Sequence, residues 1–469
     1  MTMPPFEKPP KQPRSRRRQR RRPRWRPRPR VRRPAALLLP ILAVASILAL
    51  GRPARSEDEV RLPDIVSGSF YKIPIHIEQF VYQGGVVLSF PGGDRAEIIL
   101  GQDLRYSDFF TVSLGSFASG PGGDIIPEGT RAIASASIGS SWGRPVLSGT
   151  LRDAKTQNKI FSRDYPLGDP PDRWAIHAFS DDIVLYMTGE RGIAETRIAF
   201  IQEAGQNREI HLIDYDGANQ QQLTRFGTIV LSPAFSPTGD RLAFTTFAQG
   251  QAGVAGYRIR DGRTWNISQP GAMSASPAWS PDGQQVAFTR SLSGNLEIFV
   301  ANAEGGDPTR LTYNPSIDTS PSFSPDGRRI AFTSDRSGHP EVYVMDRDGA
   351  SARRITFYGS QNDSPDWSPK GDRIAFVSML DGVFDICTVR PDGSDLVRLT
   401  GDEGTHENPR WAPDGRHLVY SKLQGGRRSL YVMASDGSGK RALTSGRSGQ
   451  YNPAWSPQLS LESSRGPSD

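Results

Sequence analysis

The chain has 469 residues, of which 57 are Lys or Arg and 50 are Asp or Glu, so its formal net charge at pH 7 is +7. Residues 1–56 hold 17 of the basic residues and one acid, which leaves 40 basic and 49 acidic residues in the remainder, a net charge of −9. This distribution excludes the nucleic-acid-binding function that overall basicity would suggest. Cys387 is the only cysteine, so no disulfide is expected, and its strand context predicts a buried, small apolar residue.

The N-terminal segment has the order of a secretory signal. An Arg- and Pro-rich run at 14–33 precedes 16 residues at 35–50 that are apolar apart from Pro40, and a short polar stretch ends in Ala54, Arg55 and Ser56. A basic region, an apolar region and small residues before a cleavage point predict export with cleavage before Glu57. The apolar run is short for a membrane-spanning helix. We therefore expect residues 1–56 to be a signal peptide with a long n-region; because this basic region is longer than usual, the alternatives are a retained anchor and a mis-called start codon.

Residues 57–190 contain no repeat and predict a small α/β domain. Apolar periodicity predicts two helices, at Arg95–Ser107 and Arg173–Thr188. β-Branched and alternating apolar residues predict four strands, of which the last two form a hairpin: Ser69–Phe80, Ala132–Ile138, Val146–Arg152 and Lys159–Tyr165.

A unit of 44 residues repeats through the rest of the chain. A Pro-x-aromatic-Ser/Ala-Pro phrase recurs with its first proline at Pro233, Pro277, Pro321, Pro365, Pro409 and Pro453. A buried strand begins at Arg197, Arg241, Gln285, Arg329, Arg373 and His417, and a short fourth strand ends near Leu223, Ile267, Leu311, Ile355, Leu399 and Leu443. The Ser-Pro-Asp-Gly sequence at 280–283 predicts a type I turn between the first two strands of its unit. A period of this length with four short strands predicts a β-propeller.

The first and last units are complementary. The first has the later strands but no Pro-x-aromatic strand, and the last has only that strand, at 452–456. Together they predict one blade and a ring of six, closed by pairing the C-terminal strand with the first three, which leaves no open sheet edge. We predict an all-β six-bladed propeller preceded by a small α/β domain, with boundaries at 1–56, 57–190, 191–460 and a disordered tail at 461–469.

The sequence favours binding over catalysis. The Gly-Ser-Ser-Trp-Gly stretch at 139–143 matches a nucleophile motif, but such a motif needs a strand-turn-helix elbow in a larger hydrolase domain. The six histidines show no metal-ligand spacing. The Asp-x-Asp-Gly sequences at 214–217 and 346–349 resemble calcium-loop fragments without the distal Glu and are better interpreted as turns. We expect no enzyme activity, no cofactor and no metal.

The constant period leaves no insertion for a lid, so a partner would bind a face or the channel mouth of the ring. The residue three positions before each repeat proline should lie just before the innermost strand. These residues are Val230, Ser274, Asp318, Asn362, His406 and Gln450, of which the last five are polar and are our predicted partner-binding residues. As loop residues, Asp318, Asn362 and His406 are expected to weaken partner binding when all three are replaced by alanine and to leave the melting temperature nearly unchanged.

Several segments resemble the TolB family, the periplasmic component of the bacterial Tol-Pal envelope system. The resemblance covers about residues 57–458 and is carried by the helix-to-propeller junction at 174–200, the first-blade turn at 214–219, the helix at 99–109, and the repeats at 232–237 and 452–457. The stretch 115–143 departs from the family, and Glu59, Val60, Arg61 and Leu62 match its N-terminal segment only loosely.

The resemblance implies a non-catalytic, monomeric periplasmic scaffold. Its propeller would bind a Pal-like peptidoglycan-associated lipoprotein, and Glu59, Val60, Arg61 and Leu62 would engage a TolA-like inner-membrane protein, with a role in outer-membrane integrity and cell division. The alternative is a periplasmic propeller that binds peptides or carbohydrates without a Tol role.

Overall fold

The computed structural model describes residues 72–83, 90, 93–115, 125–141, 143–168, 173–292, 294–446 and 448–459. The expected signal peptide, the segment from Glu59 to Leu62 and the expected tail at 461–469 lie outside these residues. The described residues belong to one compact unit. Neither of the helices found in them is long and apolar enough to cross a membrane.

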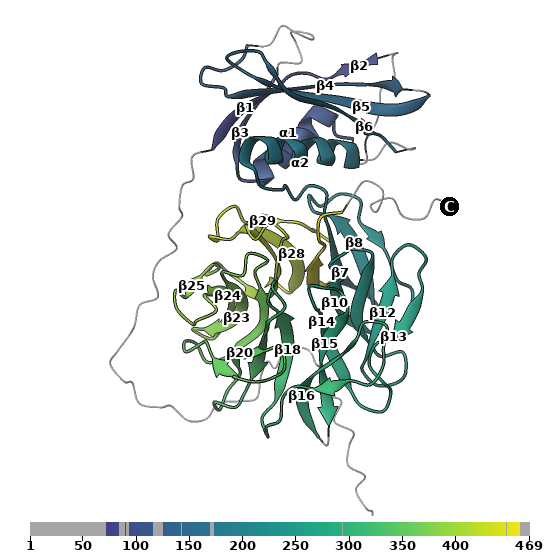
Figure 1. Ribbon diagram of the computed structural model, residues 1–469, viewed down its shortest axis with the longest axis vertical. Coiled ribbons are helices and arrows are strands. Elements are labelled where there is room, and N and C mark those ends of the chain that lie inside the picture. The colour runs from purple at the N-terminus through teal and green to yellow at the C-terminus, as the bar shows by residue number, and fades with distance from the viewer. Residues whose placement is uncertain are drawn as a thin grey trace, which may run out of the picture. The chain divides into compact units, whose positions relative to one another are not determined.

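The N-terminal domain is one sheet with two helices packed on one of its faces (Figure 1). The sheet order is β3-β1-β4-β5-β6, and β2 pairs with β4. Strand β1 is parallel to both β3 and β4, whereas β4, β5 and β6 are antiparallel. The elements are β1 (Ile73–Ile77), β2 (Val81–Tyr82), α1 (Ala96–Tyr106), β3 (Phe110–Leu114), β4 (Ala132–Ser141), β5 (Arg144–Asp153), β6 (Lys159–Pro166) and α2 (Trp174–Thr188).

Both predicted helices and the predicted hairpin are confirmed within a few residues at each end. Of the predicted strand at 69–80, residues 72–80 are described, and in them the strand β1 spans Ile73–Ile77. Strand β3 was not predicted; it follows α1 in a parallel crossover from β1, and its central residues are only half buried. The α2 helix ends at Gly189, whose φ of +76° is the left-handed conformation that glycine adopts without a Cβ clash.

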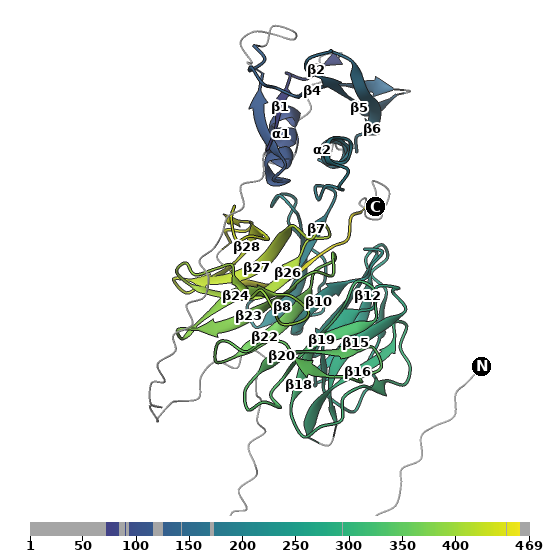
Figure 2. The ribbon, with the colours of Figure 1, turned by 60° about the vertical axis from the view of Figure 1, so that its left-hand side comes forward.

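Six four-stranded antiparallel sheets form the propeller (Figure 2), which confirms the predicted fold class. Blade 1 is closed by the C-terminal strand, in the order β30-β7-β8-β9, as the complementary end units predict. Its strands are β30 (Gln450–Trp455), β7 (Arg197–Ala204), β8 (Asn207–Asp214) and β9 (Gln221–Gln222).

The other five blades each run in chain order from the innermost to the outermost strand. Blades 2 and 3 consist of β10 (Val230–Phe235), β11 (Arg241–Thr246), β12 (Gly253–Arg258), β13 (Thr264–Asn266), β14 (Ser274–Trp279), β15 (Gln285–Leu292), β16 (Asn295–Asn302) and β17 (Thr309–Arg310). Blades 4, 5 and 6 consist of β18 (Asp318–Phe323), β19 (Arg329–Ser334), β20 (Glu341–Asp346), β21 (Arg353–Arg354), β22 (Asn362–Trp367), β23 (Ile374–Leu380), β24 (Val383–Val389), β25 (Val397–Arg398), β26 (Thr405–Trp411), β27 (His417–Gln424), β28 (Arg427–Ala434) and β29 (Arg441–Ala442).

Every innermost strand contains a β-bulge at the residue before the repeat proline. The bulged residues are serine or asparagine with φ between +48° and +55°: Ser232, Ser276, Ser320, Ser364, Asn408 and Asn452. A bulge adds one residue to its strand, so the pairing resumes beyond the proline. The innermost strands therefore begin well before the prolines.

Tryptophans after the repeat prolines join neighbouring blades. The indole Nε1–H of Trp279 donates to the Ala234 carbonyl of the preceding blade at 3.0 Å, and that of Trp411 donates to the Asp366 carbonyl at 3.1 Å. Blade 1 is joined to the segment that enters it in the same way, because Trp455 donates to Thr196 Oγ1 at 2.8 Å. Buried indoles need such partners, so these three tryptophans tie their strands to a neighbouring segment, whereas the indole of Trp367 donates to the Gly371 carbonyl of its own blade at 3.4 Å.

Candidate partner-binding face

The propeller has two ends with different loops. We call the mouth face the end formed by the loops that lead into the innermost strands, such as 223–229, 311–317 and 355–361, together with the turns between the second and third strands. We call the turn face the end formed by the turns between the first and second strands, such as 280–283, and between the third and fourth.

The residues predicted to line the mouth are buried strand residues. Ser274, Asp318, Asn362 and Gln450 each begin an innermost strand, and His406 is the second residue of its strand; Val230 begins β10. All are at most 1% exposed. The expectation that they are loop residues is wrong, because each innermost strand already begins three residues before its repeat proline, or four residues before it in β26.

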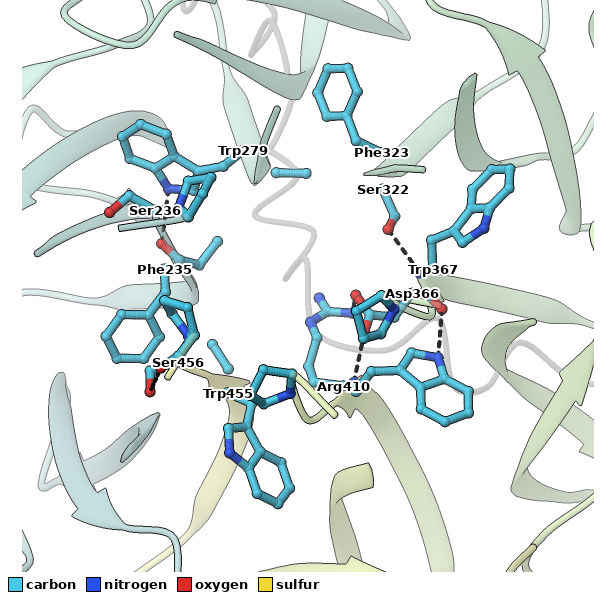
Figure 3. Close-up of a pocket in the computed structure, with 18 of the residues that line it drawn as sticks. Phe235, Ser236, Trp279, Ser322, Phe323, Asp366, Trp367, Arg410, Trp455 and Ser456 are labelled. Carbon is cyan, nitrogen blue, oxygen red and sulfur yellow. Dashed lines mark hydrogen bonds and ion pairs between the residues drawn. The ribbon is translucent and has the colours of Figure 1, made fainter. Parts of the chain in front are cut away.

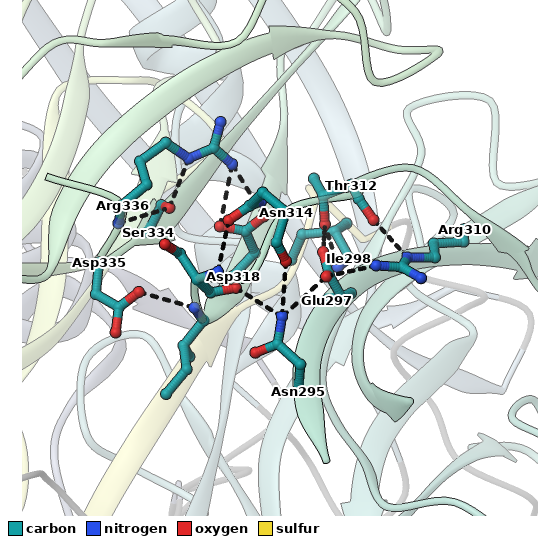
Figure 4. Close-up of polar contacts among 12 residues, drawn as sticks. Asn295, Glu297, Ile298, Arg310, Thr312, Asn314, Asp318, Ser334, Asp335 and Arg336 are labelled. Carbon is teal, nitrogen blue, oxygen red and sulfur yellow. Dashed lines mark hydrogen bonds and ion pairs between the residues drawn. The ribbon is translucent and has the colours of Figure 1, made fainter. Parts of the chain in front are cut away.

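Asp318 lies in a buried polar network at this end of blade 4 (Figure 4). Its carboxylate accepts hydrogen bonds from Arg336 Nη2 at 2.9 and 3.1 Å. Asn314 Nδ2 also donates to Asp318 Oδ2, at 2.7 Å. Because Asn314 belongs to the loop 311–317, Asp318 anchors that loop through this hydrogen bond. The guanidinium group of Arg336 neutralises the charge of Asp318.

Asn362 and His406 connect their blades to the preceding ones. Asn362 Nδ2 donates to Glu341 Oε2 on β20 at 2.9 Å and to the carbonyl of Tyr358 at 2.7 Å. His406 Nδ1 lies 3.0 Å from Asp385 Oδ1 on β24. A buried side chain that loses such a partner costs about 1–3 kcal/mol. These residues therefore stabilise the blade contacts and the loops above them.

We did not identify from the sequence the buried carboxylates that form hydrogen bonds in the polar layer beneath the mouth-face loops. Glu209, Glu297, Glu341 and Asp385 occupy one strand position in blades 1, 3, 4 and 5, and each accepts a hydrogen bond from a threonine 15 residues later. The Thr312 hydroxyl lies 2.6 Å from Glu297 Oε2, and Arg310 Nη2 donates to Glu297 Oε1 at 2.6 Å (Figure 4). Their spacing in multiples of 44 residues could have identified them as a repeated structural feature.

Exposed apolar side chains of the propeller gather on the mouth face. Among residues 197–292, 294–446 and 448–459, the large apolar side chains that are exposed all belong to loops or strand starts at this end: Phe226, Tyr313, Ile317, Phe357, Tyr358 and Val383. Tyr313 is 73% exposed and Phe357 is 63% exposed. Single exposed apolar residues are ordinary, but a group confined to one face indicates an interaction surface.

Two of these aromatic side chains are held in place by the buried network. Arg310 Cζ lies 4.6 Å from the ring centroid of Tyr313, and Arg354 Cζ lies 4.9 Å from that of Phe357. The same guanidinium groups bind the buried Glu297 and Glu341. A cation over an aromatic face is favourable, so Arg310 and Arg354, which are themselves bound to buried carboxylates, hold the exposed rings in position. Gly401 and Ser445 occupy the equivalent position in the next two blades, so this aromatic pair lies on one side of the mouth.

The central channel contains a cavity of about 290 Å³ lined by the innermost strands (Figure 3). Its charged residues are Asp366 and Arg410, whose Oδ1 and Nη1 atoms lie 3.8 Å apart. Burial raises the pKa of Asp366, while Arg410 and the backbone N–H of Trp411 act in the opposite direction. The described residues that line the cavity include neither histidine nor cysteine.

The other motifs considered from sequence are structural. Ser141 ends β4, and Gly143 has φ +76° in the turn to β5, so this stretch forms a hairpin and not a strand-turn-helix elbow. Both Asp-x-Asp-Gly sequences are turns, because the N–H of Gly217 donates to the Asp214 carbonyl and that of Gly349 to the Asp346 carbonyl, each at 2.9 Å. Cys387 is buried as predicted, and burial raises its thiol pKa to about 12.

Comparisons with known proteins agree with this fold. Residues 185–459 match the family described as the TolB beta propeller domain. The Tol-Pal system protein TolB of Cereibacter sphaeroides is 33% identical over 255 residues, which cover 50% of this chain and 55% of that protein. The corresponding protein of Methylobacillus flagellatus is 31% identical over 213 residues, covering 43% of this chain and 48% of the relative.

A TolB homolog of Chlorobium chlorochromatii is 39% identical over 134 residues, 29% of this chain and 30% of that protein. The chain thus spans 30% to 55% of the length of these curated relatives. The crystal structure of TolB from Acinetobacter baumannii superimposes with a TM-score of 0.71 at 26% identity, covering 85% of this chain and 98% of that one. Because the family match extends over more than half of its residues, the chain belongs to the TolB family.

Proposed function

We propose that this protein is a periplasmic, non-catalytic and monomeric scaffold of the Tol-Pal envelope system, which acts in outer-membrane integrity and cell division. Its mouth face binds a Pal-like peptidoglycan-associated lipoprotein, and the segment from Glu59 to Leu62 engages a TolA-like inner-membrane protein. The names of the relatives place those proteins in the Tol-Pal system. The observation that carries the proposal is the confinement of the exposed apolar side chains of the described propeller to the mouth face.

The partner contacts the loops, and the residues predicted from the repeat support them from below. Tyr313 and Phe357 form the centre of the contact, because aromatic residues on a pre-organised surface contribute most to binding. Asp318 holds the first loop through Asn314, and Asn362 holds the second through the Tyr358 carbonyl. Ser274, His406 and Gln450 act in the same supporting layer, since their side chains are also buried.

Calorimetric titration with the soluble domain of the Pal-like lipoprotein tests this assignment. Replacing Tyr313 and Phe357 together by serine removes two large apolar contacts, and we expect the affinity to fall at least tenfold, about 1.4 kcal/mol. The melting temperature should change little, because both rings are mostly exposed.

The matched control replaces Leu185 and Tyr186 on α2, which are 41% and 50% exposed and lie in the N-terminal domain. That variant should bind like the wild type. Wild-type affinity in the Tyr313/Phe357 variant would move the site off the mouth face. If the wild-type protein does not bind the lipoprotein but binds peptides or peptidoglycan fragments, the result would favour the alternative, a ligand-binding propeller without a Tol role.

A further inference from the structure

The N-terminal domain contacts the turn face of blades 1 and 6 through a buried group of charged residues. We call this group the junction cluster. It consists of Asp103 on α1, Asp108 in the turn after α1, Arg173 and His177 at the start of α2, Asp214, Tyr215 and Asp216 at the end of β8, and Asp414 and His417 at the start of β27. The side chains of both histidines are almost completely buried.

His177 lies between carboxylates of both domains. Its Nδ1 atom is 2.7 Å from Asp103 Oδ2, and the hydroxyl of Tyr215 donates to Asp103 Oδ1 at 2.6 Å. On its other side, Nε2 is buried without a hydrogen-bond partner. Asp214 and Asp216 lie close by, with one oxygen of each and a ring nitrogen within 4.8 Å of one another. Thus a histidine of the N-terminal domain is enclosed by one acid of its own domain and two of the propeller.

His417 has a similar environment, but here the histidine belongs to the propeller and the N-terminal domain supplies a carboxylate. Its Nδ1 atom lies 2.7 Å from Asp414 Oδ2 in its own blade, and its Nε2 atom lies 3.6 Å from Asp108 Oδ2 of the N-terminal domain. Nε2 is again buried without a hydrogen-bond partner. Each domain therefore contributes one imidazole that faces carboxylates of the other domain.

The acids around His177 suit an imidazolium better than a metal ion. Asp214 accepts hydrogen bonds from Arg197 Nε on one oxygen and Asn219 Nδ2 on the other. Asp216 accepts from Arg173 Nη2 and from the backbone N–H of Ala218. All four oxygens already accept hydrogen bonds, so a metal ion bound to them would have to displace these donors.

We propose that His177 and His417 are both protonated when the domains are together, and that these two imidazolium groups latch the N-terminal domain onto the propeller. Burying a charged group is unfavourable unless opposite charges and hydrogen bonds compensate it, and here the compensating carboxylates come from both domains. The latch goes beyond the proposed scaffold function and holds whichever partner binds.

The local charges agree with this protonation. Burial by itself lowers the pKa of His177, but Asp103, and after it Asp216 and Asp214, raise it from the ordinary 6.5 to about 9. Burial likewise lowers the pKa of His417, and Asp414 and Asp108 raise it to about 9. Further charged groups lie around the cluster: Lys72, Asp94, Asp181, Glu190, Glu195, Arg197, Lys370, Arg416 and Arg441.

The sign of the pH dependence follows from these shifts. A histidine whose pKa is higher in the docked state stabilises docking fully below about pH 6.5 and loses that contribution as the pH rises through 9. Burial raises the pKa of Asp181 to about 7 and that of Glu195 to about 8, so these acids also weaken the junction when they ionise. Between pH 6.5 and 9 each histidine can weaken docking by up to about tenfold per pH unit.

Nuclear magnetic resonance of the histidine rings in the purified protein tests the protonation. We expect His177 and His417 to titrate near pH 9. Asp103→Asn should lower the His177 midpoint by at least one pH unit and leave that of His417 nearly unchanged, and Asp414→Asn should do the reverse. Midpoints at or below 6.5 in the wild type, or midpoints that do not follow their own acid, would overturn the proposal.

Scanning calorimetry tests the latch itself. The wild type should melt in one transition at pH 7, and the double variant His177→Gln with His417→Gln should melt in two, one for each domain. The control is His339→Gln, whose half-buried ring lies beside Glu341 in blade 4 and not at the junction; this variant should still melt in one transition. A single wild-type transition in the double variant would overturn the latch. If that variant does not fold, the ring titration of the wild type decides alone.

Discussion

The two faces of the propeller differ in how they meet other parts of a protein. The turn face contacts the N-terminal domain through buried charges, with cations of Arg173, His177 and His417 set among carboxylates of both domains. The mouth face instead presents exposed apolar rings, such as Tyr313 and Phe357. A charged, closed contact suits a permanent neighbour whose attachment depends on pH. An exposed apolar surface suits a partner that comes and goes.

The comparison also shows where a repeated fold can vary. All six blades keep the bulge, blades 2 to 6 keep the turn between the first two strands, and blades 1, 3, 4 and 5 keep the buried carboxylate. By contrast, the residue two positions after the fourth-strand residues Leu311, Ile355 and Leu399 differs between blades. It is Tyr313 and Phe357 in two blades and Gly401 in the next. We infer that function in this fold lies where one blade departs from the others.

The largest effect is expected from opening the ring, on which both faces depend. Deleting residues 449–469 removes β30 and leaves the edge of β7 without a partner. It also removes Trp455, whose indole is bonded to Thr196 beside the junction. We expect loss of cooperative thermal melting, or aggregation, as measured by circular dichroism. A truncated protein with the wild-type melting curve would contradict the closure of the ring and with it the definition of both faces.

The propeller could be predicted from sequence because its 44-residue period can be recognised even where individual residues differ between the repeats. A 44-residue period with Ser-Pro-Asp-Gly turns specifies four short strands, and complementary end units specify the closure. The mouth residues were misplaced because the bulge at Ser320 and its equivalents lets pairing continue on the N-terminal side of the repeat proline. Strand β18, for example, begins at Asp318, three residues before Pro321. Asp318 therefore became a buried strand residue and not a loop residue.

The N-terminal domain was only partly predictable for a different reason. Its helices follow from apolar periodicity, as in Leu100 and Leu104 or Ile176, Phe179 and Ile183. Strand β3, however, pairs with β1 across a helix, and its residues are only partly buried, so local alternation is weak. Likewise, the junction cluster joins residues more than 100 positions apart, as in Tyr215 and Asp103. Such a cluster has no local sequence signal.

Asn362→Ala is expected to have a smaller effect on stability than opening the ring. It tests whether the buried side chains beneath the mouth face support the loops that bind the partner. The change removes the donor to Glu341 and to the Tyr358 carbonyl, so it should lower the free energy of unfolding by about 1–3 kcal/mol. Because it also releases the loop of Phe357 and Tyr358, partner affinity should fall moderately.

Urea unfolding and titration of the same sample separate these two effects. The Tyr313/Phe357 variant is the control, because it should lose affinity without losing stability. Equal stability of Asn362→Ala and the wild type would mean that the supporting layer contributes nothing and that Asn362 is a direct contact.

The central claim is that the mouth face is the partner face, and a hydrogen-exchange footprint of the complex tests it most directly. Amides of the loops 311–317 and 355–361 should exchange more slowly when the Pal-like domain is bound, while the turn at 280–283 and helices α1 and α2 should be unchanged. Protection confined to the turn face or to the N-terminal domain, with both mouth loops unaffected, would contradict the account.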